Sequence, residues 1–236
     1  MNRVKPHLEG VIFDMDGTIL DTEQIWEDAT FDLLAAHGIQ KHTLSAREEE
    51  LFEQMIGSGL DKAVEIMKDG FQIPRLTHEE IKREILARVN AKFAHDVKFI
   101  HGFEAFHKNL MLAGIPSSVA TNCDPVTLKG LSDKMKFVEF FGQNVYCVAD
   151  VNNKPKPDPA LFLHAAEKIK ANPTKCIVFE DSLWGFKAAL SAGMKCIGIK
   201  NRNNKDLLAE HTQGFVESYT AAEEEIIKVV DAYLRT

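Results

Sequence analysis

Apolar residues are distributed along the chain in two different patterns. Five short runs, rich in β-branched or aromatic residues, are separated by polar or helical stretches, and they lie at 11–13, 118–120, 144–148, 176–179 and 196–199. Near-continuous apolar runs that alternate with helical stretches are typical of a parallel sheet whose two faces are both covered. The pattern therefore predicts an α/β core.

The segment 22–96 has helical signals and no convincing strand. Ser45 and Glu48 have the spacing of a capping box, and Thr77 and Glu80 repeat it. Apolar residues follow each box at helical intervals, namely Leu51, Phe52, Met55 and Ile56 after the first and Ile81, Ile85, Val89 and Phe93 after the second. We therefore expect two domains, an α/β core formed by 1–21 and 97–236 and a helical insert formed by 22–96.

Composition and charge narrow the class of protein. Of 236 residues 45% are hydrophobic, which is enough for a sizeable core. Acidic residues outnumber basic ones, 35 against 28, so an anionic partner such as nucleic acid or a membrane surface is not expected. The four cysteines form no CxxC pair, the amino-terminal stretch is polar, and no apolar run is long enough to span a bilayer. We expect a cytoplasmic monomer.

The strongest chemical signal follows the first apolar run. Asp14 and Asp16 come directly after 11–13, and Gly17 allows the backbone to turn sharply there. Ligands of open α/β sheets bind at the carboxyl ends of the strands, and two carboxylates at that place attract a divalent cation. A solvated turn is the alternative interpretation of these two acids alone.

Three later segments favour a functional site over a solvated turn. Thr121 and Asn122 end the second predicted strand with a hydroxyl and an amide. A proline-rich loop, 154–159, places lysines before a predicted helix, and Glu180 and Asp181 end a further strand. Prolines hold a lysine at a fixed reach with little loss of entropy.

These four motifs, in this order, resemble those of the haloacid dehalogenase superfamily. The pattern hhhDxDGT, a helical insert, hhhTN, KPxPD and hhhEDS extends over essentially the whole chain. It is most similar to the phosphatases and mutases that carry a helical cap between the first two motifs. The resemblance implies a Rossmann-like parallel sheet core with an inserted all-helical cap domain.

The resemblance also implies catalytic roles. Asp14 would be the nucleophile that forms an aspartyl-phosphate, and Asp16 the general acid–base. Thr121 and Lys154 would bind the phosphoryl oxygens, and Asn122 would add a hydrogen-bond donor.

A magnesium site is implied by the same motifs. Asp14, Asp181 and the backbone carbonyl of Asp16 would bind Mg²⁺, with Glu180 acting through a water molecule.

Two lysines compete for the phosphate-binding role. The family pattern KPxPD fits Lys154 and leaves Lys156 at the variable position. We therefore expect Lys154 to bind the phosphoryl group and Lys156 to be solvated or a contact at the rim.

Substrate choice is expected to depend on the insert. Trp26 and Gly57 are the candidate substrate-binding residues there. In the related β-phosphoglucomutases a histidine lies twelve positions after the nucleophile, and here that position is Trp26. The predicted function is therefore a Mg²⁺-dependent phosphatase acting on a small phosphorylated metabolite, a sugar or polyol phosphate.

Three alternatives remain at this point. A β-phosphoglucomutase would pass the phosphoryl group to a sugar instead of to water. A catalytically silent binding protein would not need the complete set of acids and the lysine. A nucleotide-binding α/β domain would have a glycine-rich loop after its first strand, and Asp14 to Gly17 is not such a loop.

Overall fold

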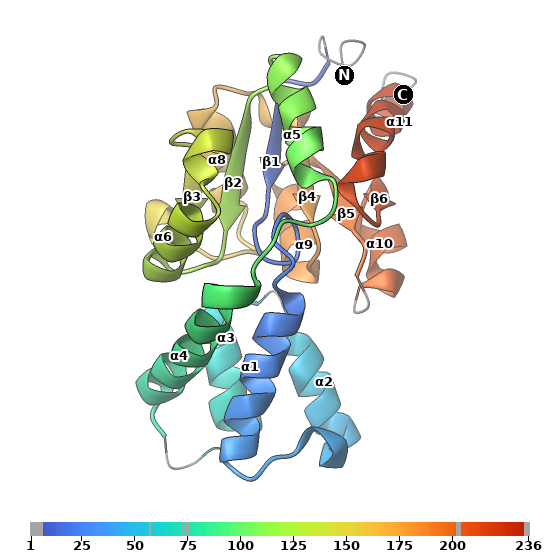
Figure 1. Cartoon of the computed structure of the whole chain (residues 1–236). Helices are drawn as coiled ribbons and strands as arrows, with labels where there is room; N and C mark the ends of the chain where they lie inside the picture. Colours follow the sequence, from blue (N-terminus) through green and yellow to red (C-terminus); the bar gives the residue numbers. More distant parts are fainter. Residues whose placement is uncertain (1–6, 57, 72, 74–75, 202–203, 234–236) are drawn as a thin grey trace. The chain divides into compact units, whose positions relative to one another are not determined.

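The computed structural model describes residues 7–56, 58–71, 73, 76–201 and 204–233 (Figure 1). The chain divides into two compact units, one formed by Met1–Asp21 and Phe99–Thr236 and the other by Thr22–Lys98. We call them the α/β unit and the helical unit. The helical unit ends two residues beyond the insert expected from the sequence, 22–96.

The α/β unit contains a six-stranded parallel sheet. Its strands are β1 (Gly10–Phe13), β2 (Ser117–Thr121), β3 (Val145–Cys147), β4 (Cys176–Glu180), β5 (Lys195–Ile199) and β6 (Gly214–Val216). The strand order is β3-β2-β1-β4-β5-β6, and every neighbouring pair is parallel. The predicted α/β class is thus confirmed, and the five predicted strands are present.

Strand β6 is absent from the sequence prediction. It has three residues, begins with glycine and lies at the edge of the sheet, where Phe215 is 48% exposed. A short edge strand needs neither a continuous apolar run nor strict alternation, so its sequence signal is weak.

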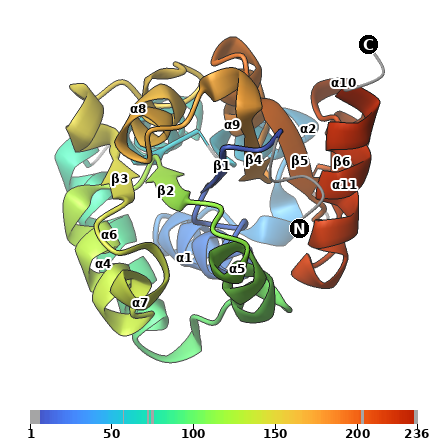
Figure 2. The same ribbon diagram turned by 90° about the horizontal axis from the view of Figure 1, so that it is seen from above.

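Helices cover both faces of the sheet. They are α5 (Phe103–Leu112), α6 (Pro125–Lys134), α7 (Phe137–Phe141), α8 (Ala160–Lys168), α9 (Leu183–Ser191), α10 (Lys205–His211) and α11 (Ala222–Tyr233), with short turns η3 (Val148–Val151), η4 (Pro173–Lys175) and η5 (Tyr219–Ala221). Figure 2 shows α8 and α9 on one side of the central strands and α5 and α7 on the other. This double cover explains why the runs 11–13 and 176–179, in the central strands β1 and β4, are apolar throughout.

Successive side chains of β1 point to opposite faces of the sheet and pack into different hydrophobic clusters, because a strand is pleated. Ile12 belongs to the cluster that includes Phe162 of α8 and Phe186 of α9. The ring of Phe13 stacks on Phe179 of β4 at 5.4 Å and meets Phe103 of α5 edge-on. Strand β1 is therefore fixed from both sides, and so is the point at which it ends.

The helical unit contains α1 (Glu23–Ala36), η1 (Lys41–Thr43), α2 (Ala46–Met55), α3 (Leu60–Glu65), the π-helical turn η2 (Ile66–Gly70) and α4 (His78–Asp96). Both predicted capping boxes are present, at the starts of α2 and α4. The four apolar residues predicted to line α4 are all buried, and they are Ile81, Ile85, Val89 and Phe93. The described residues of this unit form no β-strand.

No helix in the described part of the chain combines the length and apolar character that crossing a bilayer requires.

Candidate active site

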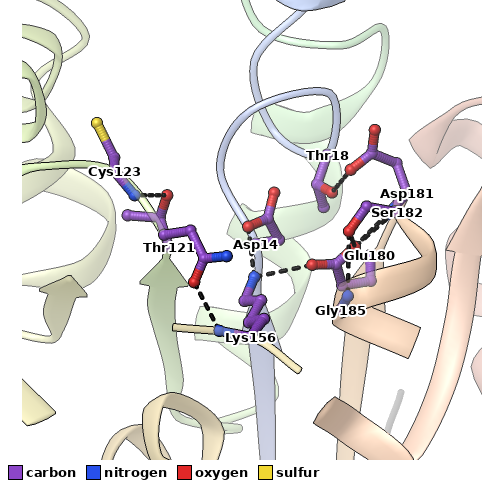
Figure 3. A network of polar contacts seen from close by, with 10 residues as sticks. Asp14, Thr18, Thr121, Cys123, Lys156, Glu180, Asp181, Ser182 and Gly185 are labelled. Carbon is purple, nitrogen blue, oxygen red and sulfur yellow. Dashed lines mark hydrogen bonds and ion pairs between the residues drawn. The ribbon is translucent and has the colours of Figure 1, made fainter. Parts of the chain in front are cut away.

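Polar side chains gather where β1, β2 and β4 end (Figure 3). Asp14 follows β1 directly, and its backbone N–H donates to the carbonyl of Phe179 at 3.0 Å, which extends the pairing of β1 with β4. The chain proceeds from β1 to β2 on one side and later places β4 on the other. Such a reversal of strand order is where open α/β sheets bind their ligands.

The turn after Asp14 brings the chain against Asp181. Gly17 has a φ of +75°, and its N–H donates to the carbonyl of Leu20 at 2.9 Å. A Cβ atom at this position would fall 2.2 Å from Asp181 Oδ2. Only glycine combines this backbone conformation with so close an approach.

Lys156 lies at the centre of the site. Its Nζ donates to Asp14 Oδ1 at 2.5 Å and to Glu180 Oε1 at 2.8 Å, and its side chain is 1% exposed. The ammonium group also lies over the ring of Phe162, 4.6 Å from the centroid. Burial alone would lower the pKa of Lys156, but the two carboxylates outweigh that effect and raise it above its ordinary value. The lysine is therefore charged.

The loop after β3 is folded so that this lysine points inward. Asn152 and Asn153 adopt left-handed backbone conformations, which asparagine tolerates, and the N–H of Asn153 donates to the carbonyl of Val148 at 2.9 Å. The backbone N–H of Lys156 then donates to Asn122 Oδ1 at 2.9 Å. This bond fixes the loop to the residue that follows β2.

The structure reverses the expectation for the two lysines. Lys154 is exposed, whereas Lys156, expected to be solvated, is buried against Asp14. The pattern KPxPD selected Lys154, but the shorter run K-P-x-P also starts at Lys156, so the selection rested on one aspartate, Asp158. The hydrogen bond from the backbone N–H of Lys156 to Asn122 Oδ1 holds residue 156, and not residue 154, beside Asp14.

Glu180 is fully occupied by hydrogen-bond donors. Besides the bond from Lys156 to Oε1, its Oε2 accepts from the N–H of Asp181 at 2.8 Å, and from the N–H and Oγ of Ser182 at 2.7 and 3.0 Å. The side chain is 1% exposed. These contacts do not support the predicted role of Glu180 at a metal, and they make it a partner of Lys156 instead.

Asp181 is held by residues that the sequence analysis did not single out. Its Oδ1 accepts from Thr18 Oγ1 at 3.2 Å, and its Oδ2 accepts from Asn201 Nδ2 at 3.2 Å. Asn204 is 3% exposed, and its Nδ2 donates to the backbone carbonyls of Asp181 at 2.7 Å and Ile199 at 2.9 Å. Thr18 follows the DxDG motif directly and could have been found there, whereas the two asparagines belong to no motif.

The end of β2 supplies further polar groups. Thr121 is buried, and its Oγ1 accepts from the N–H of Cys123 at 3.1 Å. The Nδ2 group of Asn122 is buried and has no hydrogen-bond partner among the described residues. A buried donor without a partner is costly, so this amide is suited to bind an acceptor on a ligand.

The site has an excess of negative charge. Among the described residues, four acids lie at these strand ends, Asp14, Asp16, Glu180 and Asp181, and the buried cation beside them is Lys156, which contacts Asp14 and Glu180. Burial raises the pKa of Asp14 to about 7; Lys156 opposes the rise, and the charges of Glu180 and Asp16 add to it. A cation beside Asp14 would restore its ionised form.

The carboxylates suit a magnesium ion that has few protein ligands. The described residues contain no group of three or more acidic, histidine or cysteine side chains that could hold a metal ion. Mg²⁺, however, is usually bound through one or two carboxylates together with water and substrate phosphate. Asp14 and Asp181, buried on either side of the Gly17 turn, match that requirement.

Two predicted substrate-binding residues belong to the helical unit. Gly57 lies outside the described residues. Trp26, on α1, is partly buried, and its ring meets Phe93 of α4 edge-on at 6.1 Å. This contact packs two helices of the same unit together.

The chain is similar to several known proteins in sequence and fold. Residues 11–199 match the family described as haloacid dehalogenase-like hydrolase. The 6-phosphogluconate phosphatase of Escherichia coli is 29% identical over 190 residues, which cover 80% of each chain. The fructose-1-phosphate phosphatase YqaB of the same organism is 28% identical over 195 residues, 81% of this chain and 96% of that one. The crystal structure of β-phosphoglucomutase from Clostridium difficile has a TM-score of 0.78 at 21% identity, covering 97% of this chain and all of the other, and it shows the shared fold.

Proposed function

Because the chain belongs to the haloacid dehalogenase-like hydrolase family, we propose that it is a phosphatase that hydrolyses sugar or polyol phosphates through an aspartyl-phosphate. The observation that carries the proposal is the contact of buried Lys156 with Asp14 at the carboxyl end of β1. A fixed cation beside a strand-end carboxylate is the arrangement that attack on an anionic phosphate requires.

Asp14 is the proposed nucleophile. One oxygen, Oδ1, accepts from Lys156 at 2.5 Å, which leaves Oδ2 to attack phosphorus. Attack forms the Asp14–phosphorus bond and breaks the bond from phosphorus to the ester oxygen of the substrate. Water then attacks phosphorus, releases inorganic phosphate and restores the carboxylate.

The phosphoryl oxygens need donors as their charge develops. Lys156 supplies the positive charge, and the unpartnered Nδ2 of Asn122 supplies a neutral donor. Thr121, buried at the end of β2, adds its hydroxyl. Donors held in place before the reaction stabilise the transition state without reorganising. Lys156 therefore replaces Lys154 in the role expected from the sequence.

Asp16 is the proposed general acid–base. It lies two residues after the nucleophile in the same turn and is partly exposed. In this role it protonates the departing ester oxygen and later removes a proton from the attacking water. Its charge adds to the rise in the pKa of Asp14 that burial causes.

Magnesium is the proposed cofactor. Asp14, Asp181 and the carbonyl of Asp16 are the groups that would hold it. When bound, the ion supplies positive charge that neutralises the acids and the incoming phosphate. Thr18 and Asn201 hold the two oxygens of Asp181 in place for this purpose.

The experiment is a screen of phosphate release from sugar, polyol, glycolate and nucleoside monophosphates with Mg²⁺. We expect release from at least one sugar or polyol phosphate, and loss of release after metal stripping in excess EDTA. Full turnover in EDTA would contradict the role of the metal, and no release from any ester would contradict the phosphatase.

The product separates a phosphatase from a mutase. With β-glucose 1-phosphate, Mg²⁺ and a trace of the bisphosphate, a phosphatase that accepts this sugar yields inorganic phosphate. Accumulation of glucose 6-phosphate with little free phosphate would assign the protein to the mutases. We expect phosphate, because Trp26 occupies the position at which those mutases carry a histidine.

A further inference from the structure

Position 185, in the first turn of α9, carries no side chain and faces the Glu180 carboxylate (Figure 3). A Cβ atom built there falls 1.7 Å from Glu180 Oε1 and 1.8 Å from its Cδ, closer than real Cβ atoms approach any neighbour. The glycine is buried, and its N–H donates to Ser182 Oγ at 3.1 Å. The carboxylate therefore occupies the space that any side chain at 185 would fill.

Moving the Glu180 carboxylate away from position 185 would cost free energy. Its side chain is 1% exposed, and its two oxygens accept four hydrogen bonds, one of them from Lys156 at 2.8 Å. A displaced carboxylate would lose some of these partners inside a buried site, where unpaired polar groups are costly. Lys156 would then retain only Asp14 of its two acidic partners.

We propose that Gly185 is a positioning residue for the reaction. Its missing side chain leaves room for the Glu180 carboxylate, which in turn fixes the ammonium group of Lys156 against Asp14. The inference rests on the proposed function and adds to it a residue that touches none of the reacting atoms.

Another glycine of the same unit provides the contrast. Gly130 lies inside α6, and a Cβ atom there would meet nothing within 4 Å. Inside a helix, glycine is less favourable than alanine. Alanine is therefore acceptable at 130, whereas at 185 the same change places a methyl group inside a carboxylate.

The first test compares Gly185→Ala with Gly130→Ala, using p-nitrophenyl phosphate as the substrate. We expect kcat to fall by about tenfold or more in Gly185→Ala, because misplacement of a catalytic group is costly even at about 1 Å. We expect Gly130→Ala to retain wild-type kcat and to unfold at the same or a higher temperature. A Gly185→Ala enzyme with wild-type kcat would overturn the proposal.

The second test shortens the acid. Glu180→Asp removes one methylene and withdraws the carboxylate from position 185. We expect Gly185→Ala to lower kcat much less in the Glu180→Asp background than in the wild type, a departure from additivity that shows direct coupling. If Gly185→Ala lowered kcat by the same factor in both backgrounds, position 185 would not act through the Glu180 carboxylate, and the proposal would be overturned.

The combination of Gly185→Ala with Glu180→Asp still tests the proposal if Gly185→Ala alone fails to fold. In that case the proposal requires the double variant Glu180→Asp/Gly185→Ala to fold. Failure of the double variant, with folded Glu180→Asp alone, would contradict it.

A measurement without substrate separates this inference from the proposed function. In protein labelled with ¹⁵N-lysine, the ammonium signal of Lys156 is identified by its loss in Lys156→Arg. We expect Gly185→Ala to shift this signal and Gly130→Ala to leave it unchanged. If the wild type released no phosphate but the signal shifted in Gly185→Ala, the proposed phosphatase function would be wrong and the positioning role of Gly185 would stand. If the wild type were active but the signal did not shift in Gly185→Ala, the positioning role would be wrong and the phosphatase function would stand.

Discussion

An ion pair of the α/β unit and an ion pair of the helical unit differ sharply in their surroundings. In the α/β unit, Lys156 and Glu180 lie 2.8 Å apart and each side chain is 1% exposed. In the helical unit, Lys82 and Asp61 lie 2.6 Å apart, yet their side chains are 30% and 88% exposed. The distances are alike, and the surroundings differ completely.

This difference shows why distance alone does not rank an ion pair. An exposed pair is screened by water and contributes little to stability, whereas a buried pair is costly to assemble and costly to break. The buried cluster around Lys156 lies where the three strands β1, β2 and β4 end, which is where open α/β sheets bind their ligands. The exposed pairs of the helical unit need no such explanation.

Replacing an acid in each unit should give the largest contrast. Asp14→Asn removes the proposed nucleophile and should lower kcat by roughly 10⁴-fold or more, because an amide does not form the covalent intermediate. Its control is Asp61→Asn, in the helical unit, which should leave kcat within about twofold of the wild type, as expected of an exposed acid that pairs with Lys82. Phosphate release under single-turnover conditions measures both variants. Near-normal turnover by Asp14→Asn would exclude the covalent mechanism.

The two lysines of one loop sharpen the comparison further. Lys156→Met should lower kcat by about 10²–10³-fold, the range for removal of one fixed donor to a developing charge. Lys154→Met should change kcat by less than about twofold, since an exposed side chain of this kind contributes little. Steady-state kinetics, with unfolding temperatures to verify the fold, test both. The reverse order of effects would restore the assignment made from the sequence.

The fold was largely predictable because each local signal agreed with the global arrangement. The runs that became β1 and β4 are apolar throughout, and both faces of the sheet are covered. The two capping boxes placed the starts of α2 and α4 correctly. Strand β6 was missed because an edge strand of three residues carries little pattern.

The site was predictable only as far as residues that immediately follow strands. Asp14 and Asp181 directly follow β1 and β4, and Thr121 ends β2, so their places in the fold could be predicted from the strands. Their roles in the reaction stay predictions. Lys156 was misjudged because its direction depends on Asn122, thirty-four residues away, through a bond that no local pattern encodes. Asn204, which holds the backbone of Asp181 from the loop after β5, was missed for the same reason.

The dependence of stability on pH should include a contribution from a buried histidine of the α/β unit. His107 of α5 is fully buried, and burial lowers its pKa to about 4. The unfolded chain, with an ordinary histidine pKa near ~6.5, binds the proton more readily, so stability falls as the pH decreases from about 6.5 towards 4. At pH 5 the loss from this group should be about 2 kcal/mol.

Urea unfolding between pH 7.5 and 4.5 measures this dependence. His107→Gln should flatten the curve over that interval, although Gln also changes the contact with Ser117 Oγ, which lies 2.8 Å from the ring Nε2. His42→Gln, at an exposed position of the helical unit, is the control for replacing a histidine by glutamine. Identical slopes in the wild type and His107→Gln would mean that folding does not lower the pKa of His107.

The smallest effect is expected for the exposed pair itself. Lys82 and Asp61 join α4 to α3 at 2.6 Å, and the high exposure of Asp61 allows water and salt to screen the attraction. A double-mutant cycle of Lys82→Gln and Asp61→Asn, followed by urea unfolding, should give a coupling free energy below about 0.5 kcal/mol that declines further at high salt. Phosphatase activity should remain at the wild-type level in all three variants. A coupling free energy well above 1 kcal/mol that does not change with salt would show that this pair is as well shielded from water as the pair of Lys156 and Glu180. The two ion pairs would then differ in their chemistry and not in their burial.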